Sequence, residues 1–146
     1  MRTLKLGFDF DGVTVFTNSL KAYYIEKYYG VEIPLYQCRR KVLVDGGILR
    51  PNQYDRVRDK VVATEAGLWV DSMPGSLAYL LRLKKDGHHL KIITSRREDG
   101  TRIAKKWFEI RRINIKIVRT NGDDKRKAAK GLDAYLKGEF SIKGPK

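Results

Sequence analysis

Strand-like and helix-like segments alternate along this chain, and this alternation restricts the fold more than any other feature. An apolar strand is expected over residues 3–10. The second half then repeats helix and strand, with these expected elements: a helix over 76–85, a strand over 90–94, a helix with inner positions Ile103, Trp107 and Ile110, a strand over 113–118, a basic helix over 123–130 and a strand over 133–136. Such alternation predicts an α/β fold in which helices cover both faces of a mostly parallel sheet.

The stretch that follows the first strand is less regular. Asn18-Ser19 would be suitable caps for a helix over 20–29, which Gly30 would end. A second helix is expected over 51–66, because a proline opens it and its apolar residues recur at helical spacing. Residues 31–50 give no clear pattern, since a proline and a pair of glycines interrupt them.

The first strand runs into Asp9-Phe10-Asp11-Gly12. Because side chains alternate along a strand, Asp9 and Asp11 are expected on one side and Phe10 on the other. Two carboxylates so close repel each other unless a cation lies between them or one keeps a proton. Mg²⁺ prefers such oxygen ligands, and ligands bind at the carboxyl ends of strands in this class of sheet. The two acids are therefore candidate catalytic and metal-binding residues. An internal arginine that neutralised them would count against that role.

Composition limits the class of protein. The chain of 146 residues is long enough for one domain with a small appended subdomain. Its 31 Lys and Arg against 17 Asp and Glu give a net charge of +14, which favours nucleic acid or anionic substrates as partners, or else serves solubility alone. Cys38 is the single cysteine, so a reducing compartment is expected. Without a signal-peptide pattern or a long apolar run, we expect a soluble, cytoplasmic protein that does not enter a membrane. The oligomeric state is not indicated.

Three segments resemble motifs of the haloacid dehalogenase superfamily, whose commonest members are Mg²⁺-dependent phosphatases. Residues 8–13, Phe-Asp-Phe-Asp-Gly-Val, resemble its first motif, and residues 92–96, Ile-Ile-Thr-Ser-Arg, resemble its second. Met73-Pro74-Gly75 is similar to the segment that precedes the second motif in many nucleotidases of the family. The first motif is the most specific of the three.

The resemblance implies a fold and a mechanism. The fold would be a Rossmann-like, haloacid dehalogenase-like three-layer sandwich built from residues 1–16 plus 72–146, with a small helical cap over 17–71. Asp9 would be the nucleophile that forms an aspartyl-phosphate, and Asp11 the general acid and then the general base. A Mg²⁺ ion would bind the Asp9 carboxylate, the Asp11 backbone carbonyl and a phosphoryl oxygen, offsetting charge in the transition state.

Further site residues follow from the same motifs. Thr94 would donate its hydroxyl to a phosphoryl oxygen, helped by the Ser95 backbone amide. Lys125, which opens the helix after the third strand, is the expected third-motif lysine, with Lys127 and Lys130 as alternatives. The expected substrate-binding residues are Gly12, Ser95 and Arg96, the last through bidentate bonds to phosphate.

The fourth motif departs from the family pattern. Members carry one or two aspartates at the end of the fourth strand, where this chain has Lys137 and Gly138. A lysine there would repel the cation. Glu139, or Asp123-Asp124 from the preceding loop, are the acids that would replace the missing ones.

One hypothesis leads and others remain open. The leading one is a Mg²⁺-dependent phosphatase that acts on a phosphorylated small molecule or nucleotide, with its nearest resemblance to 5′-nucleotidases and deoxyribonucleotidases. A nucleic-acid terminus is a further substrate class. The alternative is a weakened or inactive protein on the same scaffold that binds nucleic acid through its basic surface. A response-regulator receiver ranks last, because no aspartate follows the second or third strand in the way that family requires.

Overall fold

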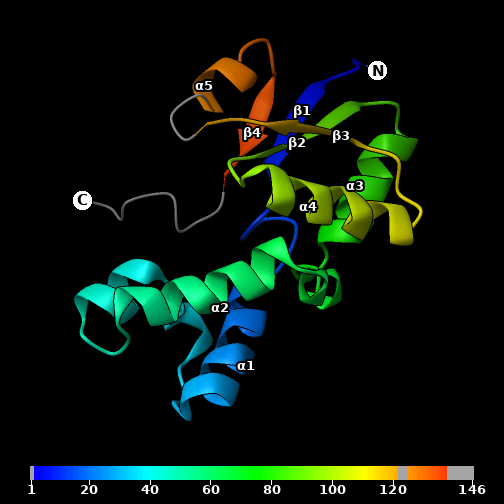
Figure 1. The fold of residues 1–146 in the computed structure, drawn as a ribbon. Helices are drawn as coiled ribbons and strands as arrows, with labels where there is room; N and C mark the ends of the chain where they lie inside the picture. Colours follow the sequence, from blue (N-terminus) through cyan, green and yellow to red (C-terminus); the bar gives the residue numbers. More distant parts are fainter. Residues whose placement is uncertain (1, 122–124, 138–146) are drawn as a thin grey trace.

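Four parallel strands form one sheet in the computed structural model, which describes residues 2–121 and 125–137 (Figure 1). Their order is β3-β2-β1-β4, with the bounds β1 Lys5–Asp9, β2 His89–Thr94, β3 Lys116–Arg119 and β4 Ala134–Leu136. The central strands β1 and β2 pair Phe8 with Ile92 and Asp9 with Ile93. Because neighbouring strands are parallel, their carboxyl ends meet at one edge of the sheet.

One face of the sheet holds the main hydrophobic cluster. Helices α3 (Ser76–Lys85) and α4 (Glu98–Ile110) cover this face, as Figure 1 shows. Phe8 on β1 is buried in this cluster together with Trp107 and Phe108 on α4. Three large aromatic side chains at one layer boundary bury much apolar surface, which stabilises the contact between helix and sheet.

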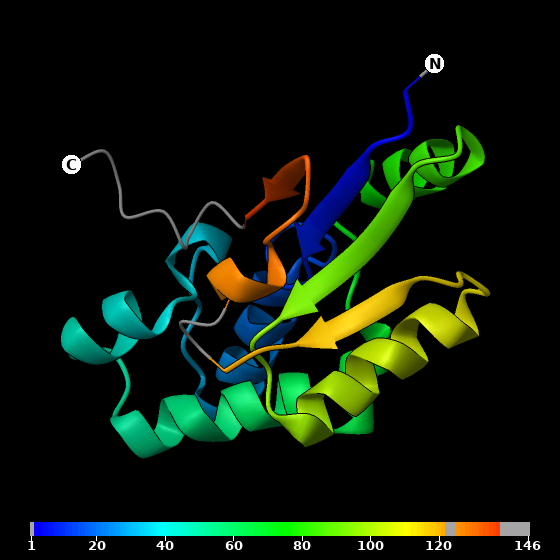
Figure 2. The same ribbon diagram turned by 90° about the horizontal axis from the view of Figure 1, so that it is seen from above.

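The opposite face carries α5 (Lys125–Ala128), as Figures 1 and 2 show. Gly7 lies on this face, and a Cβ atom there would come within 2.5 Å of the Leu132 side chain and 3.4 Å of the Tyr135 ring. The missing side chain therefore allows β4 and the residues before it to pack closely against β1. Tyr135 is the direct partner of Gly7 in the sheet.

A second hydrophobic cluster lies apart from the first and is built by the elements after the first motif. These elements are α1 Thr17–Tyr29, η1 Leu35–Gln37, the π-helical turn η2 Lys41–Asp45, α2 Pro51–Ala63 and η3 Glu65–Trp69. The buried members of the cluster are Ile25, Cys38, Leu43, Leu49, Tyr54, Val57 and Val61. Figure 1 shows α1 and α2 together on the far side of α4 from the sheet.

The chain passes into and out of this helical part through two segments that lie side by side. The Phe16 N–H donates to the Asp71 carbonyl at 2.8 Å, and the Met73 N–H donates to the Thr14 carbonyl at 2.9 Å. A separate hydrophobic cluster joined by adjacent segments is the arrangement expected of an inserted unit. The division into residues 1–16 plus 72–146 and a cap over 17–71 stays a prediction.

The element bounds differ from the expected ones mostly in the helical part. Helix α1 begins at Thr17 rather than residue 20, and the Asn18 side chain donates to the Leu35 carbonyl instead of capping the helix. Gly30 ends the helix as predicted, with φ of 69° and its N–H on the Glu26 carbonyl. Helix α2 ends at Ala63, before residue 66, because a 3-10 turn follows it.

In the second half, helix 76–85 is confirmed and the other bounds shift by a few residues. Ile103 and Trp107 on α4 are buried as predicted, but Ile110 is 56% exposed and does not belong to the inner face. Strand β3 begins at Lys116 rather than at residue 113. In the part of the chain that is described, no helix is both long and apolar enough to span a membrane.

Candidate active site

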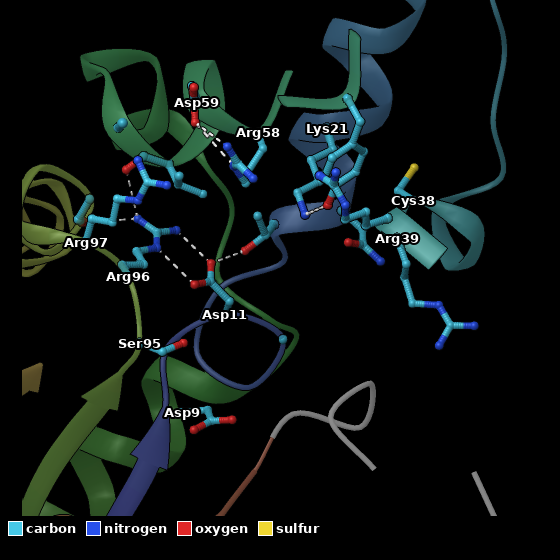
Figure 3. A pocket seen from close by; sticks show the side chains of 18 of the residues that line it. Asp9, Asp11, Lys21, Cys38, Arg39, Arg58, Asp59, Ser95, Arg96 and Arg97 are labelled. Atoms are coloured by element: carbon cyan, nitrogen blue, oxygen red, sulfur yellow. Dashed lines mark hydrogen bonds and ion pairs between the residues drawn. The ribbon is translucent and has the colours of Figure 1, made fainter. Parts of the chain in front are cut away.

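A cavity of about 1400 Å³ lies between the carboxyl edge of the sheet and the helices of the second cluster. Figure 3 shows side chains from both parts that line it. Its acidic lining residues are Asp9, Asp11, Asp59 and Asp99, and its basic ones are Lys21, Arg39, Arg40, Lys41, Arg58, Arg96, Arg97 and Lys125. Basic side chains thus outnumber acidic ones two to one among the described residues, so the cavity favours anionic ligands.

Asp9 lies at the end of the central strand β1 and is only 4% exposed. The Lys125 Nζ atom is 3.1 Å from its Oδ1 atom, and the Tyr135 hydroxyl donates to the same oxygen. Burial, the hydrogen bond to Asp9 and the charge of Asp9 raise the pKa of Tyr135, so its hydroxyl keeps the proton that it donates. Two donors therefore converge on the predicted nucleophile, one of them charged.

Asp11 has a different environment. Strand β1 ends at Asp9, so the alternation that was expected to place the two acids on one side does not extend to Asp11. Gly12, with φ of 83°, follows in the turn. The Asp11 carboxylate lies against Arg96, whose Nη2 atom is 2.6 Å from Oδ1 and whose Nε atom is 2.9 Å from Oδ2, and it also accepts a hydrogen bond from the Thr17 hydroxyl at 2.5 Å.

This pairing keeps Asp11 ionised. Burial raises the pKa of Asp11, but the Arg96 charge, the hydrogen bonds from Arg96 and Thr17, and the Lys21 charge outweigh burial and lower the pKa to about 2. The sequence analysis named an internal arginine as an observation against catalysis. The structure places such an arginine on Asp11, whereas Asp9 is met by a lysine and a neutral tyrosine.

Arg96 connects three parts of the molecule. Its side chain is 6% exposed, and its Nη1 atom donates to the carbonyls of Val62 on α2 and Gly100 on α4, at 3.4 and 3.3 Å. The guanidinium also lies over the Phe10 ring, 4.8 Å from its centroid. Sequence analysis predicted Arg96 as a phosphate ligand. In this structure its Nε–Nη2 edge is instead occupied by Asp11.

The remaining predicted residues lie at the same edge of the sheet. Ser95 and Gly12 line the cavity, as does Lys125, the preferred third-motif lysine. Thr94 ends β2 and is 3% exposed; its hydroxyl accepts the Arg96 backbone N–H at 3.2 Å, and it is not among the cavity-lining residues. The structure thus brings six of the seven predicted site residues to one cavity and places Thr94 just behind them.

Sequence analysis missed Tyr135, Thr17 and the basic side chains of the helical part. A signal for Tyr135 was present, because it faces the side-chain-free Gly7 in β1, two residues before Asp9 on the same face. Thr17 and the basic residues offered no comparable signal, since only the packing of the helices brings them to the cavity.

The described residues fit a Mg²⁺ ion that takes few protein ligands. No group of three or more His, Cys, Asp or Glu lies together within residues 2–121 and 125–137. The fitting oxygen donors are the Asp9 carboxylate and the Asp11 backbone carbonyl, because Mg²⁺ often keeps several waters and binds one carboxylate plus substrate phosphate. Lys137 follows β4 as the sequence implied. The predicted replacement acids Glu139, Asp123 and Asp124, with Gly138, lie outside the described residues.

Comparison with known proteins supports the fold. No protein-family model and no curated protein matches the sequence. A protein from Clostridium difficile, provisionally assigned as a phosphatase, matches with a TM-score of 0.51 at 16% identity over 84% of this chain and 64% of its own. A hydrolase from Pseudomonas syringae matches with a TM-score of 0.42 at 22% identity, over 79% of this chain and 59% of its own. A protein from Bacteroides fragilis, provisionally assigned as a haloacid dehalogenase-like hydrolase, gives 0.46 at 15% identity, over 97% and 66%.

The chain therefore spans 59%, 64% and 66% of the length of the Pseudomonas, Clostridium and Bacteroides structures. At such low identities a structural likeness concerns the fold alone. The strand order β3-β2-β1-β4 and the likeness to the structure of TM-score 0.51 confirm the predicted fold class: this chain has an α/β fold with a four-stranded parallel sheet in its described part.

Proposed function

We propose that the protein is a phosphatase that hydrolyses a phosphomonoester with Asp9 as the nucleophile. The observation that carries this proposal is the position of Asp9, a buried carboxylate at the end of a central strand, beside Lys125 in a cavity lined mainly by basic side chains. A phosphoryl group is an anion, so the cavity attracts it and Lys125 offsets the charge that builds up in the transition state.

The proposed reaction has two steps. An Asp9 carboxylate oxygen attacks phosphorus, and as the new O–P bond forms, the bond to the leaving alcohol oxygen breaks and that oxygen takes a proton from Asp11. A water molecule then attacks phosphorus, gives a proton to Asp11 and releases inorganic phosphate, which restores Asp9. Tyr135 holds the Asp9 carboxylate in place through its hydrogen bond.

The role of Asp11 requires it to leave Arg96. With a pKa of about 2 in its pairing with Arg96, Asp11 is ionised at neutral pH and has no proton to give. An incoming phosphate dianion competes with Asp11 for the guanidinium, because both bind it through two parallel hydrogen bonds. Arg96 would thereby take up its predicted role as a phosphate ligand, and the released Asp11, beside the anionic substrate, would take up a proton from solvent and pass it to the leaving oxygen.

The cofactor expected for this reaction is Mg²⁺. The Asp9 carboxylate and the Asp11 backbone carbonyl would hold it, and when bound it would reduce the negative charge on the phosphoryl oxygens. Thr94 and the Ser95 amide would orient the same oxygens from the end of β2.

A direct test compares the wild type with Asp9→Asn, using release of phosphate from an aryl phosphate with and without Mg²⁺. We expect release by the wild type, an increase with Mg²⁺, and no release by the variant. Asp59→Asn is the matched control, because Asp59 lines the same cavity but pairs with Arg58 at the surface. Hydrolysis that survives in Asp9→Asn would refute the nucleophile.

The substrate subclass that we favour is a nucleotide. Met73-Pro74-Gly75 supports it, because the segment resembles that of family nucleotidases and lies directly before α3. A panel of nucleoside monophosphates and sugar phosphates tests this subclass. Equal or faster turnover of the sugar phosphates would reject it.

The second candidate function is binding of nucleic acid without catalysis. The basic lining of the cavity and the engagement of Asp11 by Arg96 favour it. In that case no phosphate is released at any Mg²⁺ concentration, and affinity for a single-stranded oligonucleotide falls steeply as salt is raised.

A further inference from the structure

Five of the described basic residues line the cavity from the side of the helical part; Arg58 on α2 pairs with Asp59, and the other four lie on α1 and around η2. These four are Lys21 on α1 and Arg39, Arg40 and Lys41 around the start of η2, and together we call them the cap-side cluster. Figure 3 shows Lys21 and Arg39 on one side of the cavity and Arg96 and Arg97 on another, with Asp9 and Ser95 nearest the sheet.

Lys21 is the member with the most specific environment. Its side chain is half-buried, its Nζ atom donates to the Tyr54 hydroxyl at 2.8 Å, and the same atom lies 5.2 Å from the centre of the Tyr54 ring. Within the described residues Lys21 makes no ion pair. A half-buried ammonium that has only a neutral partner is costly unless an anion comes to it.

Among the described residues, none of the cavity's acids forms an ion pair with Lys21, because each contacts another partner directly. Asp9 pairs with Lys125, Asp11 with Arg96 and Asp59 with Arg58, while the Asp99 carboxylate accepts the Gly100 N–H. Arg40 is partly compensated by Asp55, at 2.6 Å. The positive charge of Lys21, whose direct hydrogen-bond partner is the neutral Tyr54 hydroxyl, is therefore the one that can attract a ligand.

The size of the cavity and the position of Lys21 suggest a ligand that reaches from Asp9 to the cap-side cluster. Ligand pockets commonly measure about 300–1,000 Å³, whereas this cavity measures about 1400 Å³. Lys21 also lies close enough to Asp11 to help lower its pKa, so the cluster and the proposed catalytic acids share one space. A single phosphate at Asp9 would leave Lys21 with the Tyr54 hydroxyl as its direct polar partner in the described part of the chain.

We propose that the cap-side cluster binds a second phosphate of the substrate, so that the preferred substrate is a phosphomonoester that carries another phosphate group. The first phosphate is the one that reacts at Asp9, and this assignment rests on the proposed function. The second phosphate can belong to a small bisphosphate or to the backbone of an oligonucleotide with a terminal phosphate, since both offer the same anionic oxygens to Lys21.

The kinetic test uses adenosine 5′-monophosphate, adenosine 3′,5′-bisphosphate and a 5′-phosphorylated trinucleotide. The wild type is expected to prefer at least one of the two compounds with more than one phosphate group about tenfold in kcat/KM over the monophosphate, which is the effect of one charged hydrogen bond. Lys21→Gln should remove most of that preference by raising KM, and Lys21→Arg should retain it. Lys27→Gln is the control, because Lys27 is an exposed residue in the last turn of α1 and does not line the cavity.

A binding test separates this proposal from the proposed function. The affinities of Asp9→Asn and of the double variant Asp9→Asn/Lys21→Gln for the same three compounds are measured by calorimetry. If a compound with more than one phosphate group binds more tightly than the monophosphate, and if this difference depends on Lys21, the cap-side site is supported. This holds even if no variant releases phosphate, and in that case only the phosphatase proposal fails. Equal affinity and equal turnover of all three compounds, or a preference that Lys21→Gln leaves unchanged, would overturn the cap-side site. If the bisphosphate is preferred, the second phosphate belongs to a small molecule; if the trinucleotide is preferred, it belongs to an oligonucleotide backbone.

Discussion

Two carboxylates lie only two residues apart, one at the end of strand β1 and one in the turn that follows it, but their partners come from different parts of the molecule. Asp9 is held by Lys125 and Tyr135, which belong to α5 and β4. Asp11 is held by Thr17 on α1 and by Arg96, which also bonds to Val62 on α2. The described partners of the first acid therefore come from the sheet and its covering helix, whereas those of the second depend on how the helical part packs. The proposed nucleophile is built into the sheet side of the molecule, and the proposed acid-base group is tied to the helical part.

The largest expected effect separates the chemical roles of the two acids. Asp9→Asn should lower phosphate release on the order of 1,000-fold or more, because no covalent intermediate can form. Asp11→Asn should lower it by about 100-fold to 10,000-fold and leave the nucleophile intact. Intact mass spectrometry after rapid quenching should detect a phosphoryl group on Asp11→Asn but none on Asp9→Asn. A phosphorylated Asp9→Asn protein would contradict the comparison.

The next effect concerns stability. Arg96→Gln leaves Asp11 without its cation and removes the guanidinium bonds to Val62 and Gly100. We expect a loss of about 2 kcal/mol in the free energy of unfolding, less than the ~3–5 kcal/mol typical of a broken buried pair, because the Asp11 side chain is 38% exposed. Urea denaturation measures this loss. Arg97→Gln is the control, since Arg97 is an exposed neighbour, and a similar loss in both variants would argue against a special role for Arg96.

A smaller effect is expected at Tyr135. Tyr135→Phe removes one hydrogen bond from Asp9 and keeps the ring, so kcat should fall by about tenfold, equivalent to roughly 1.4 kcal/mol. KM for an aryl phosphate should change little, because the hydroxyl contacts the nucleophile rather than the substrate. Steady-state kinetics measures kcat and KM separately and so tests whether only kcat falls. Tyr79→Phe is the control, because Tyr79 is an exposed tyrosine outside the cavity.

The smallest effect is the pH dependence of stability. The folded-state pKa of Asp11, about 2, lies below its ordinary value of 3.8. Its contribution to stability is therefore complete above about pH 4 and is lost as the pH falls through 2. The difference in unfolding free energy between wild type and Asp11→Asn, measured by urea denaturation, should shrink between pH 4 and pH 2. A difference that stays constant over this range would show that Arg96 does not hold the carboxylate in solution.

The strands and helices of the sheet could be predicted from the sequence, because the local pattern of apolar residues there agrees with the overall fold. Apolar strands, the helix over 76–85 and the acids at the tip of β1 all follow from short-range periodicity. The helical part was harder to predict, because η2 is a π-helical turn that Gly46 and Gly47 follow, and its apolar residues recur with no simple period. The Asp9–Lys125 contact was suggested by a family resemblance. The Arg96–Asp11 pair was not, because 85 positions separate its members and no local pattern joins them.

Gly7 carries no functional group, yet it lies beside the side chains that surround the predicted nucleophile. The Tyr135 ring, whose hydroxyl donates to Asp9, lies 3.4 Å from the position that a Cβ atom of residue 7 would take, which is an ordinary contact, whereas the Leu132 side chain lies at 2.5 Å. A substitution there would therefore force the Leu132 side chain to shift, just before the strand that carries Tyr135. The sheet thus limits the size of a residue that takes no part in the proposed chemistry.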